Sequence, residues 1–168
     1  MSKKDYYSFR KVRQEKNFVE SAQKRWSFKM KAKEELKHVI YASRPTEFDM
    51  SIVQEILVSA RTNNEKNDIT GALLFGDDLY LQLLEGPVEP VTETVKIITD
   101  DPRHHEIQIL KEGFTSRRLF ASWTMREDSL ATWSWTSEDI KNGLIHKLKP
   151  EEALNAFVNL SREIDQFI

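Results

Sequence analysis

Three side chains with neutral hydrogen-bonding groups stand out among the apolar stretches of this sequence. Tyr41 and Gln82 each lie inside a hydrophobic run, and Asn64 follows a segment with helical periodicity. A primary amide carries two donors and two acceptor lone pairs, so burying it without partners is unfavourable. Gln82 therefore faces solvent, bonds to nearby backbone, or pairs with a polar partner in the interior.

The side-chain alternation along residues 79–84 leaves the orientation of Gln82 open. Gln82 would share one face of a strand with Tyr80 and Leu84, while three leucines occupy the other face. Since both faces are largely apolar, Gln82 has hydrophobic neighbours whichever face meets the helices.

The elements that must position these residues follow the order β-α-β-β-α-β-β. Apolar runs bounded by turn residues predict strands, and apolar residues at helical spacing predict helices. The predicted strands are 38–44, 69–75, 79–84, 107–114 and 119–125, and the predicted helices are 49–62 and 88–99, with a polar break at 63–68. This order predicts an α+β fold, a ferredoxin-like sandwich of two helices on a mainly antiparallel sheet.

Further helices are predicted on both sides of this core. They span about 15–36, 137–148 and 151–167. We therefore divide the chain into a helical extension (1–37), a core domain (38–126) and a C-terminal helical segment (127–168) for output or oligomerisation.

Charge is distributed unevenly along the chain. Residues 1–37 hold twelve Lys and Arg against five Asp and Glu, whereas the remainder holds thirteen against twenty-two. A basic segment on an acidic body is typical of contact with nucleic acid or a membrane surface, and equally of packing on its own domain or a second subunit. Nucleic-acid binding is expected only through this extension, which interleaves aromatic residues with the charges: Tyr6, Tyr7, Phe9, Trp26 and Phe28.

Composition excludes several classes of function. The 168 residues suit one domain, and 39% hydrophobic with 31% charged residues is typical of globular proteins. The absence of cysteine excludes disulfides, thiolate metal sites and thiol nucleophiles. No apolar stretch has the length of a membrane span or follows the pattern of a secretory signal, so we expect a cytoplasmic protein. Adjacent His104 and His105 would point apart, so no metal site is expected.

Phosphate-binding and metalloprotease motifs are absent, and five glycines are too few for a phosphate-cradling loop. A nucleotide would therefore be held by side chains and strand edges. An enzyme on this fold would need a positioned acid and base. Glu85 and His104 are the only plausible pair, and nothing in the sequence brings them together.

Six segments, in order and with compatible spacing, resemble the BLUF family of blue-light sensors that use FAD. They are 40–43 (IYAS), 60–64 (ARTNN), 69–75 (ITGALLF), 81–87 (LQLLEGP), 101–104 (DPRH) and 118–125 (RLFASWTM). The resemblance covers about residues 38–126 and implies the same ferredoxin-like fold. It also implies non-covalently bound FAD, with the flavin ring between the two core helices.

The resemblance implies roles for individual residues. Tyr41 matches the tyrosine that donates an electron to the excited flavin, and Gln82 matches the glutamine that bridges this tyrosine and the ring. Asn64 matches the asparagine that pairs with the C4 carbonyl and N3–H of the ring. Further residues are expected to line the cofactor pocket, namely Ser43, Asn63, Arg103 and His104.

Trp123 and Met125 match a pair whose positions relative to the flavin are proposed to change on illumination. The tail is similar to the helical tails of short family members that act through other proteins. We therefore expect a sensor and not an enzyme, which signals to a partner protein in trans or through a homo-oligomer. The alternatives are a small ferredoxin-like-fold enzyme and a nucleic-acid-binding module.

Overall fold

The computed structural model describes residues 35–76, 78–130 and 135–165. Within these ranges five strands form one sheet, in the spatial order β4-β1-β3-β2-β5. The strands are β1 (Leu36–Pro45), β2 (Thr70–Gly76), β3 (Leu79–Pro87), β4 (His104–Thr115) and β5 (Arg126–Ser129). The helices are α2 (Met50–Lys66), α3 (Val88–Thr99), α4 (Ser137–Lys141), α5 (Leu144–Lys147) and α6 (Pro150–Asp165).

The sheet is mixed and mainly antiparallel. β1 pairs antiparallel with β3 and β4, and β2 pairs antiparallel with β3 and parallel with β5. The β1–β3 register sets Tyr41 directly opposite Gln82. The ferredoxin-like α+β fold that the sequence predicts is thus confirmed.

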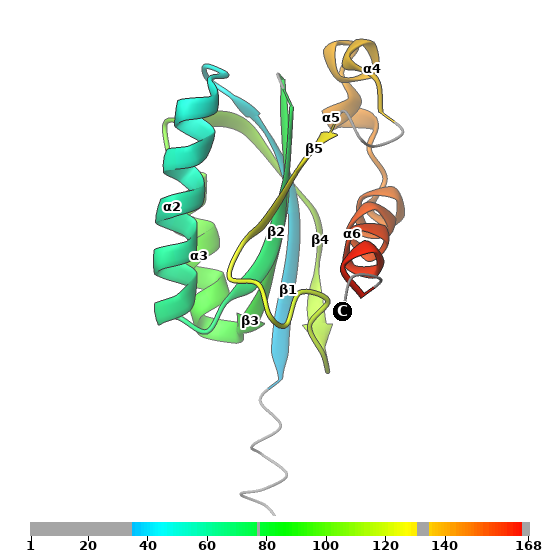
Figure 1. The fold of residues 1–168 in the computed structure, drawn as a ribbon. Helices are drawn as coiled ribbons and strands as arrows, with labels where there is room; N and C mark the ends of the chain where they lie inside the picture. The colour runs from blue at the N-terminus through cyan, green and yellow to red at the C-terminus, as the bar shows by residue number, and fades with distance from the viewer. Residues whose placement is uncertain (1–34, 77, 131–134, 166–168) are drawn as a thin grey trace, which may run out of the picture. The chain divides into compact units, whose positions relative to one another are not determined.

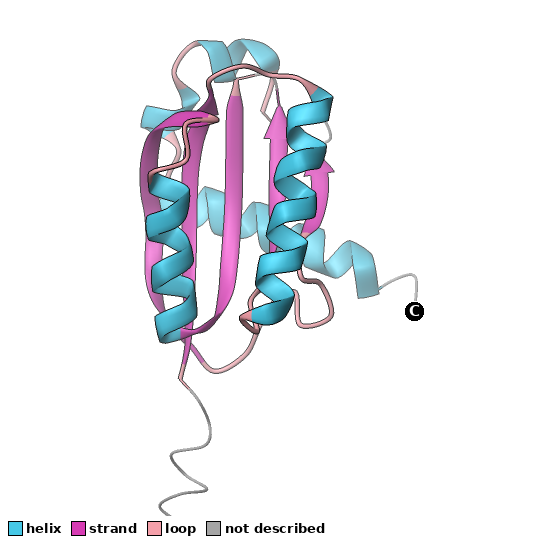
Figure 2. Ribbon diagram, turned by 90° about the vertical axis from the view of Figure 1, so that its left-hand side faces the viewer, coloured by secondary structure: helices cyan, strands magenta, loops and turns pink. Residues whose placement is uncertain are grey.

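Helices cover both faces of this sheet. α2 and α3 lie against one face, and α6 with the short α4 and α5 lies on the other (Figure 1). After a rotation of 90°, α2 and α3 lie in front of the strands, and α6 crosses behind them (Figure 2). Because both faces are covered, β3 is apolar on both sides, which explains why alternation alone did not orient Gln82.

Each helical layer closes its own hydrophobic core. Asp49 is the N-cap of α2, and its carboxylate accepts the Ser51 N–H at 2.7 Å. The helix buries Val53 and Leu57. On the other face, Phe157 of α6 is fully buried and packs edge to face on Phe120, with 6.4 Å between the ring centroids.

The prediction of a strand over residues 119–125 is wrong. The last strand is β5, and the preceding residues form turns. The amides of Leu119 and Phe120 donate to the buried Glu85 carboxylate, and the Trp123 N–H donates to the Phe120 carbonyl at 3.0 Å. These donors are therefore unavailable to a strand ladder, although the side-chain pattern is typical of one.

Two element boundaries also differ from the predictions. α2 continues to Lys66, so the expected polar break at 63–68 is largely helical, and the Asn67 N–H caps the carbonyls of Asn63 and Asn64. β1 begins at Leu36, which pairs with Pro87, so it starts within the segment assigned to the extension.

The C-terminal segment holds the two helical regions expected there, with one interruption. The predicted helix 137–148 is broken between α4 and α5, where Gly143 adopts a φ of 81°. The predicted helix 15–36 lies outside the described residues, apart from its last two positions. No helix in the described part of the chain is long and apolar enough to cross a membrane.

Candidate functional site

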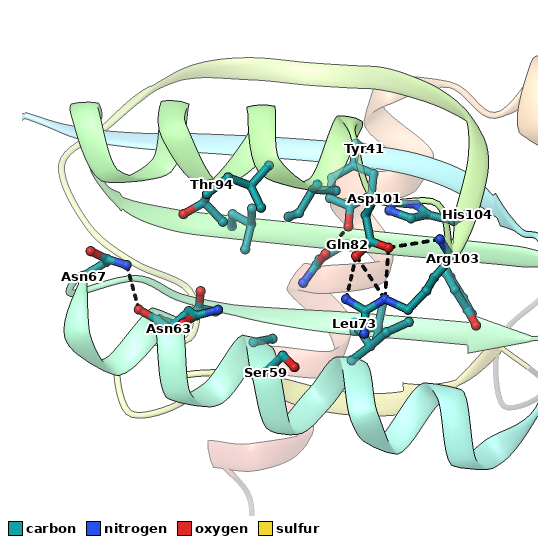
Figure 3. A pocket seen from close by; sticks show the side chains of 17 residues that line it. Tyr41, Ser59, Asn63, Asn67, Leu73, Gln82, Thr94, Asp101, Arg103 and His104 are labelled. Atoms are coloured by element: carbon teal, nitrogen blue, oxygen red, sulfur yellow. Dashed lines mark hydrogen bonds and ion pairs between the residues drawn. The ribbon is translucent and has the colours of Figure 1, made fainter.

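A cavity of about 250 Å³ lies between α2, α3 and the β1–β3 region of the sheet. Its walls combine apolar side chains from both helices with a small set of polar groups (Figure 3). Six of the nine residues expected at the cofactor or its photochemistry line the cavity: Tyr41, Asn63, Asn64, Gln82, Arg103 and His104.

Tyr41 and Gln82 form a hydrogen-bonded pair on the sheet side of the cavity. The Tyr41 hydroxyl donates to Gln82 Oε1, and Gln82 Nε2 donates to the Met125 sulfur at 3.4 Å. All three side chains are at most 4% exposed. Burial, with a smaller contribution from the Asp101 carboxylate, raises the pKa of Tyr41 well above its ordinary value. The phenol is therefore protonated at neutral pH and acts as a donor.

The polar groups of the cavity keep unfilled hydrogen-bonding capacity. A thioether is a weak acceptor, so among the residues that the structure describes the Gln82 NH₂ group has only one, weak partner. The buried Tyr80 hydroxyl, beside the cavity, has no hydrogen-bond partner among the residues that the structure describes. A planar ligand with apolar faces and a polar edge fits this combination of walls and amides.

Asn64 and Asn63 occupy the last turns of α2 and differ in exposure. Asn64 is 2% exposed, and its Nδ2 donates to the Thr124 carbonyl at 2.7 Å. Asn63 is exposed and lies toward the end of the cavity near Asn67, whose Nδ2 donates to the Asn63 carbonyl at 2.8 Å (Figure 3). Asn64 thus joins the cavity wall to the segment before β5.

At the other end of the cavity, Arg103 is paired with Asp101. The guanidinium binds both carboxylate oxygens, with contacts of 2.5 to 3.0 Å. This pairing lowers the pKa of Asp101, which keeps the carboxylate charged. The charges largely neutralise each other, so the cavity presents mainly neutral groups to a ligand.

His104 packs behind this pair, between two tyrosines. Its ring centroid lies 6.3 Å from that of Tyr41 and 6.5 Å from that of Tyr80. His104 Nδ1 lies 2.7 Å from Ser43 Oγ, and burial lowers the pKa of the imidazole. Ser43 is fully buried behind His104 and does not itself line the cavity.

Trp123 and Met125 are separated by the turn that precedes β5. Met125 is 2% exposed and reaches Gln82, whereas Trp123 is 38% exposed and lies outside the cavity. The guanidinium carbon of Arg126 lies 5.2 Å from the centroid of the Trp123 ring, a cation–π contact. The structure therefore brings Met125 to the Tyr41–Gln82 pair and leaves Trp123 out.

The acid and base considered for an enzyme do not meet. Glu85 binds the backbone of Leu119 and Phe120 on the α6 side of the sheet, and burial raises its pKa. His104 packs on Tyr41, which belongs to the core under α2 and α3. The sheet separates the two groups, so they cannot act on one substrate.

Sequence reasoning did not assign Tyr80 or Asp101 to the site. Tyr80 could have been found from its alternation with Gln82 on the same strand face. Asp101 could have been found from its spacing to Arg103, because an acid two residues before an arginine in a turn readily pairs with it.

Comparison with known proteins gives a consistent result. The family model described as sensors of blue-light using FAD (BLUF) matches residues 36–126, more than half of the chain. The blue light- and temperature-regulated antirepressor BluF of Escherichia coli is 38% identical over 68 residues, which are 40% of this chain and 17% of that protein. The photoactivated adenylate cyclase subunit beta of Euglena gracilis is 32% identical over 103 residues, which are 58% of this chain. This chain spans only 12% of the cyclase subunit.

Two solved structures resemble most of the chain. The dark-state structure of BlrB, a BLUF protein, is 27% identical with a TM-score of 0.67, and the match covers 77% of this chain and 98% of BlrB. The photo-activated state of BlsA is 25% identical with a TM-score of 0.60, covering 74% of this chain and 92% of BlsA. Both similarities extend beyond the length of the family match.

Proposed function

This chain belongs to the BLUF family of sensors of blue light using FAD, and from that premise we propose that the cavity between α2 and α3 binds the flavin ring of FAD. The observation that carries the proposal is the buried Tyr41–Gln82 pair, whose amide still has hydrogen-bonding capacity at the cavity. The chain has no cysteine, which excludes attachment of the flavin through a cysteinyl thioether, and we propose that the flavin is held non-covalently.

The cavity walls fit such a ring. Gln82 and Asn64 supply amides for the polar edge of the ring, and apolar side chains such as Ile56 and Leu73 supply surfaces for its faces. The volume of about 250 Å³ is close to the lower end of the range for ligand pockets, roughly 300–1,000 Å³. It suits the ring system, with the rest of the cofactor extending past the partly exposed Arg103 at one end of the cavity.

When bound, the flavin supplies an excited state that accepts an electron after absorption of blue light. Tyr41 is the electron donor that is hydrogen-bonded to Gln82, and a phenol releases its Oη proton as it is oxidised. Because Gln82 Oε1 accepts from that hydroxyl, loss of the Tyr41 proton directly changes the hydrogen bonding of the Gln82 amide. Rotation of the Gln82 amide exchanges its donor and acceptor ends, which would break the contact from Nε2 to Met125.

We further propose that the rearrangement at Met125 is the output signal. Met125 directly precedes β5, and the chain continues from β5 into α4, α5 and α6. In this division, 38–126 is the sensor and 127–168 passes the signal to a second copy or to another protein. Two similar proteins are an antirepressor and a subunit of a photoactivated adenylate cyclase, which supports the control of another activity as the output. In this proposal the sensor itself carries out photochemistry and not catalysis.

The test is the absorption of the FAD-loaded protein before and after blue light. We expect a small red shift that reverses in the dark. Gln82→Leu should retain FAD and lose the shift, because the ring still packs while the exchangeable amide is gone. Tyr41→Phe should also lose the shift, because the donor hydroxyl is removed.

Tyr80→Phe is the matched control, since it removes a phenol hydroxyl from the same cavity region that has no partner in the described residues. Once loaded with FAD, this variant should show the red shift, because the Tyr41–Gln82 pair is retained. A normal light response in Gln82→Leu would refute the proposed switch, and failure of the wild type to take up FAD would refute the proposed site.

A further inference from the structure

The segment from Thr124 to Glu127 is attached to α2 at three points. Asn64 Nδ2 donates to the Thr124 carbonyl at 2.7 Å, and Arg61 Nε donates to the Met125 carbonyl at 3.2 Å. The other end of the Arg61 guanidinium forms an ion pair with Glu127. Arg61 and Asn64 are three residues apart, so they project from the same side of the helix.

These contacts act where the strand ladder gives little support. β5 pairs with β2 only from Arg126 onward, and before this pairing the Gly71 N–H of β2 donates to the Trp123 carbonyl at 3.1 Å. Met125 therefore lies between the end of a turn and the start of a strand. Its backbone carbonyl is fixed by a side chain, that of Arg61.

The orientation of Met125 is sensitive to this backbone position. In a regular strand, Trp123 and Met125 would point to the same face. Here one is 38% exposed and the other 2% exposed, so the segment departs from regular strand geometry between them. A guanidinium fork is suited to holding such a position, because it can bind a carbonyl and a carboxylate at once in a fixed geometry.

We infer that Arg61 is a positioning residue for the light-sensing hydrogen bonds: by holding the Met125 carbonyl and the Glu127 carboxylate together, it keeps the Met125 sulfur on Gln82 and Trp123 outside. This inference rests on the proposed roles of Tyr41 and Gln82. It assigns to α2, which also carries cavity residues, direct control over the segment that leads into β5.

The test compares Arg61→Gln with three other variants in FAD-loaded protein. The first readout is the ¹³C-methyl NMR signal of Met125 in the dark, identified among the four methionines by its loss in Met125→Leu. In Arg61→Gln we expect this signal to move toward that of the half-exposed Met50, because the backbone anchor is gone.

The second readout is the rate of dark recovery after blue light. Recovery requires Gln82 to regain its contact with the Met125 sulfur, so a displaced Met125 should slow it. Discounting a charge-assisted hydrogen bond for the 39% exposure of Arg61, we expect recovery to slow by about threefold to tenfold, with FAD affinity within about twofold of wild type.

Two variants separate the contacts of Arg61 with the Met125 carbonyl and the Glu127 carboxylate, and a third controls for the loss of a positive charge elsewhere. Glu127→Gln removes the ion pair and keeps the carbonyl contact, so its effects should be smaller and in the same direction. Arg61→Lys keeps the charge without the fork, and its effects should fall between those of wild type and Arg61→Gln. Lys96→Gln removes a cation from an exposed ion pair on α3 and should leave both readouts unchanged.

The outcomes separate this inference from the proposed function. If the wild type responds to light and Arg61→Gln matches it in both the Met125 signal and the recovery rate, the role of Arg61 is refuted and the sensor stands. If Arg61→Gln does not fold, unchanged readouts in Glu127→Gln and Arg61→Lys refute it equally. A wild type that binds FAD without any light response instead refutes the proposed function.

Discussion

On one face of β3, Gln82 binds two side chains of different chemistry, one from β1 and one from the turn before β5. Its oxygen accepts from the Tyr41 hydroxyl, and its nitrogen donates to the sulfur of Met125. The first contact is strong and the second weak, so the amide has a preferred orientation that a change at Tyr41 can reverse. Apolar surroundings increase the free-energy difference between the two orientations, because water cannot compensate a lost bond.

His104 gives the site a pH dependence that can be predicted with its sign. Burial lowers the pKa of His104 in the folded protein below its ordinary value of 6.5. The stability from this neutral imidazole is therefore present above about pH 6.5 and is lost as pH falls through the folded pKa. We expect the free energy of unfolding to decrease on acidification below pH 6.5, by at most about 1.4 kcal/mol per pH unit for this one group.

Urea unfolding of wild type and His104→Gln across this pH range checks the prediction. The variant should lose part of the slope, because Gln does not titrate. The lowered pKa of His38 adds a slope of the same sign, so His38→Gln provides the comparison. Parallel curves for wild type and His104→Gln would rule out a contribution from His104.

At the scale of elements, a separate hydrophobic core lies on each face of the sheet, and only one of the two cores surrounds the cavity. The core under α2 and α3 surrounds the cavity, and the core under α6 contains no part of it. Contacts with the rest of the domain hold the C-terminal helices in place, among them Phe157 on Phe120 and the 3.0 Å contact between Gln108 of β4 and His146 of α5. Stability and cofactor binding can therefore be perturbed separately.

Phe157→Ala tests this separation. Removing a fully buried ring should lower the free energy of unfolding by about 3–5 kcal/mol, as judged from urea denaturation. The folded fraction should still bind FAD, because the cavity lies on the other face of the sheet. Val58→Ala on α2, where the side chain is 62% exposed, should change stability by less than about 0.5 kcal/mol. Loss of FAD from folded Phe157→Ala would show that the two cores are coupled.

At the scale of the molecule, charge separates the N-terminal segment from the rest. Residues 1–37 carry a clear excess of positive charge and the remainder an excess of negative charge. Opposite charges on two copies attract, and salt weakens that attraction. The extension is thus our candidate for controlling self-association or partner binding.

Deletion of residues 1–34 tests this role and preserves β1, which begins at Leu36. We expect an unchanged red shift and dark recovery, because every cavity residue is retained. The subunit number, measured by light scattering in dark and light at low and high salt, should change. If the truncated and full-length proteins match in size under all four conditions, the extension does not control self-association.

The sequence by itself determined the element order and the family. Six short segments in compatible order identified BLUF, and the family model confirms that assignment. Most strands and helices were found within a few residues, because alternation and helical spacing are local properties. The continuation of α2 through Asn63 and Asn64 was missed, since polar residues there resemble a loop unless the capping bonds are known.

Only the tertiary structure decided which way the decisive side chains face. Alternation could not orient Gln82, because α6 covers the second face of the sheet and makes both sides of β3 apolar. The last strand was misplaced because Glu85, more than thirty residues earlier, accepts the amides of Leu119 and Phe120. Met125 faces inward and Trp123 outward within that distorted segment. Such choices depend on hydrogen bonds between residues distant in sequence, which compete with local preference and are absent from any local pattern.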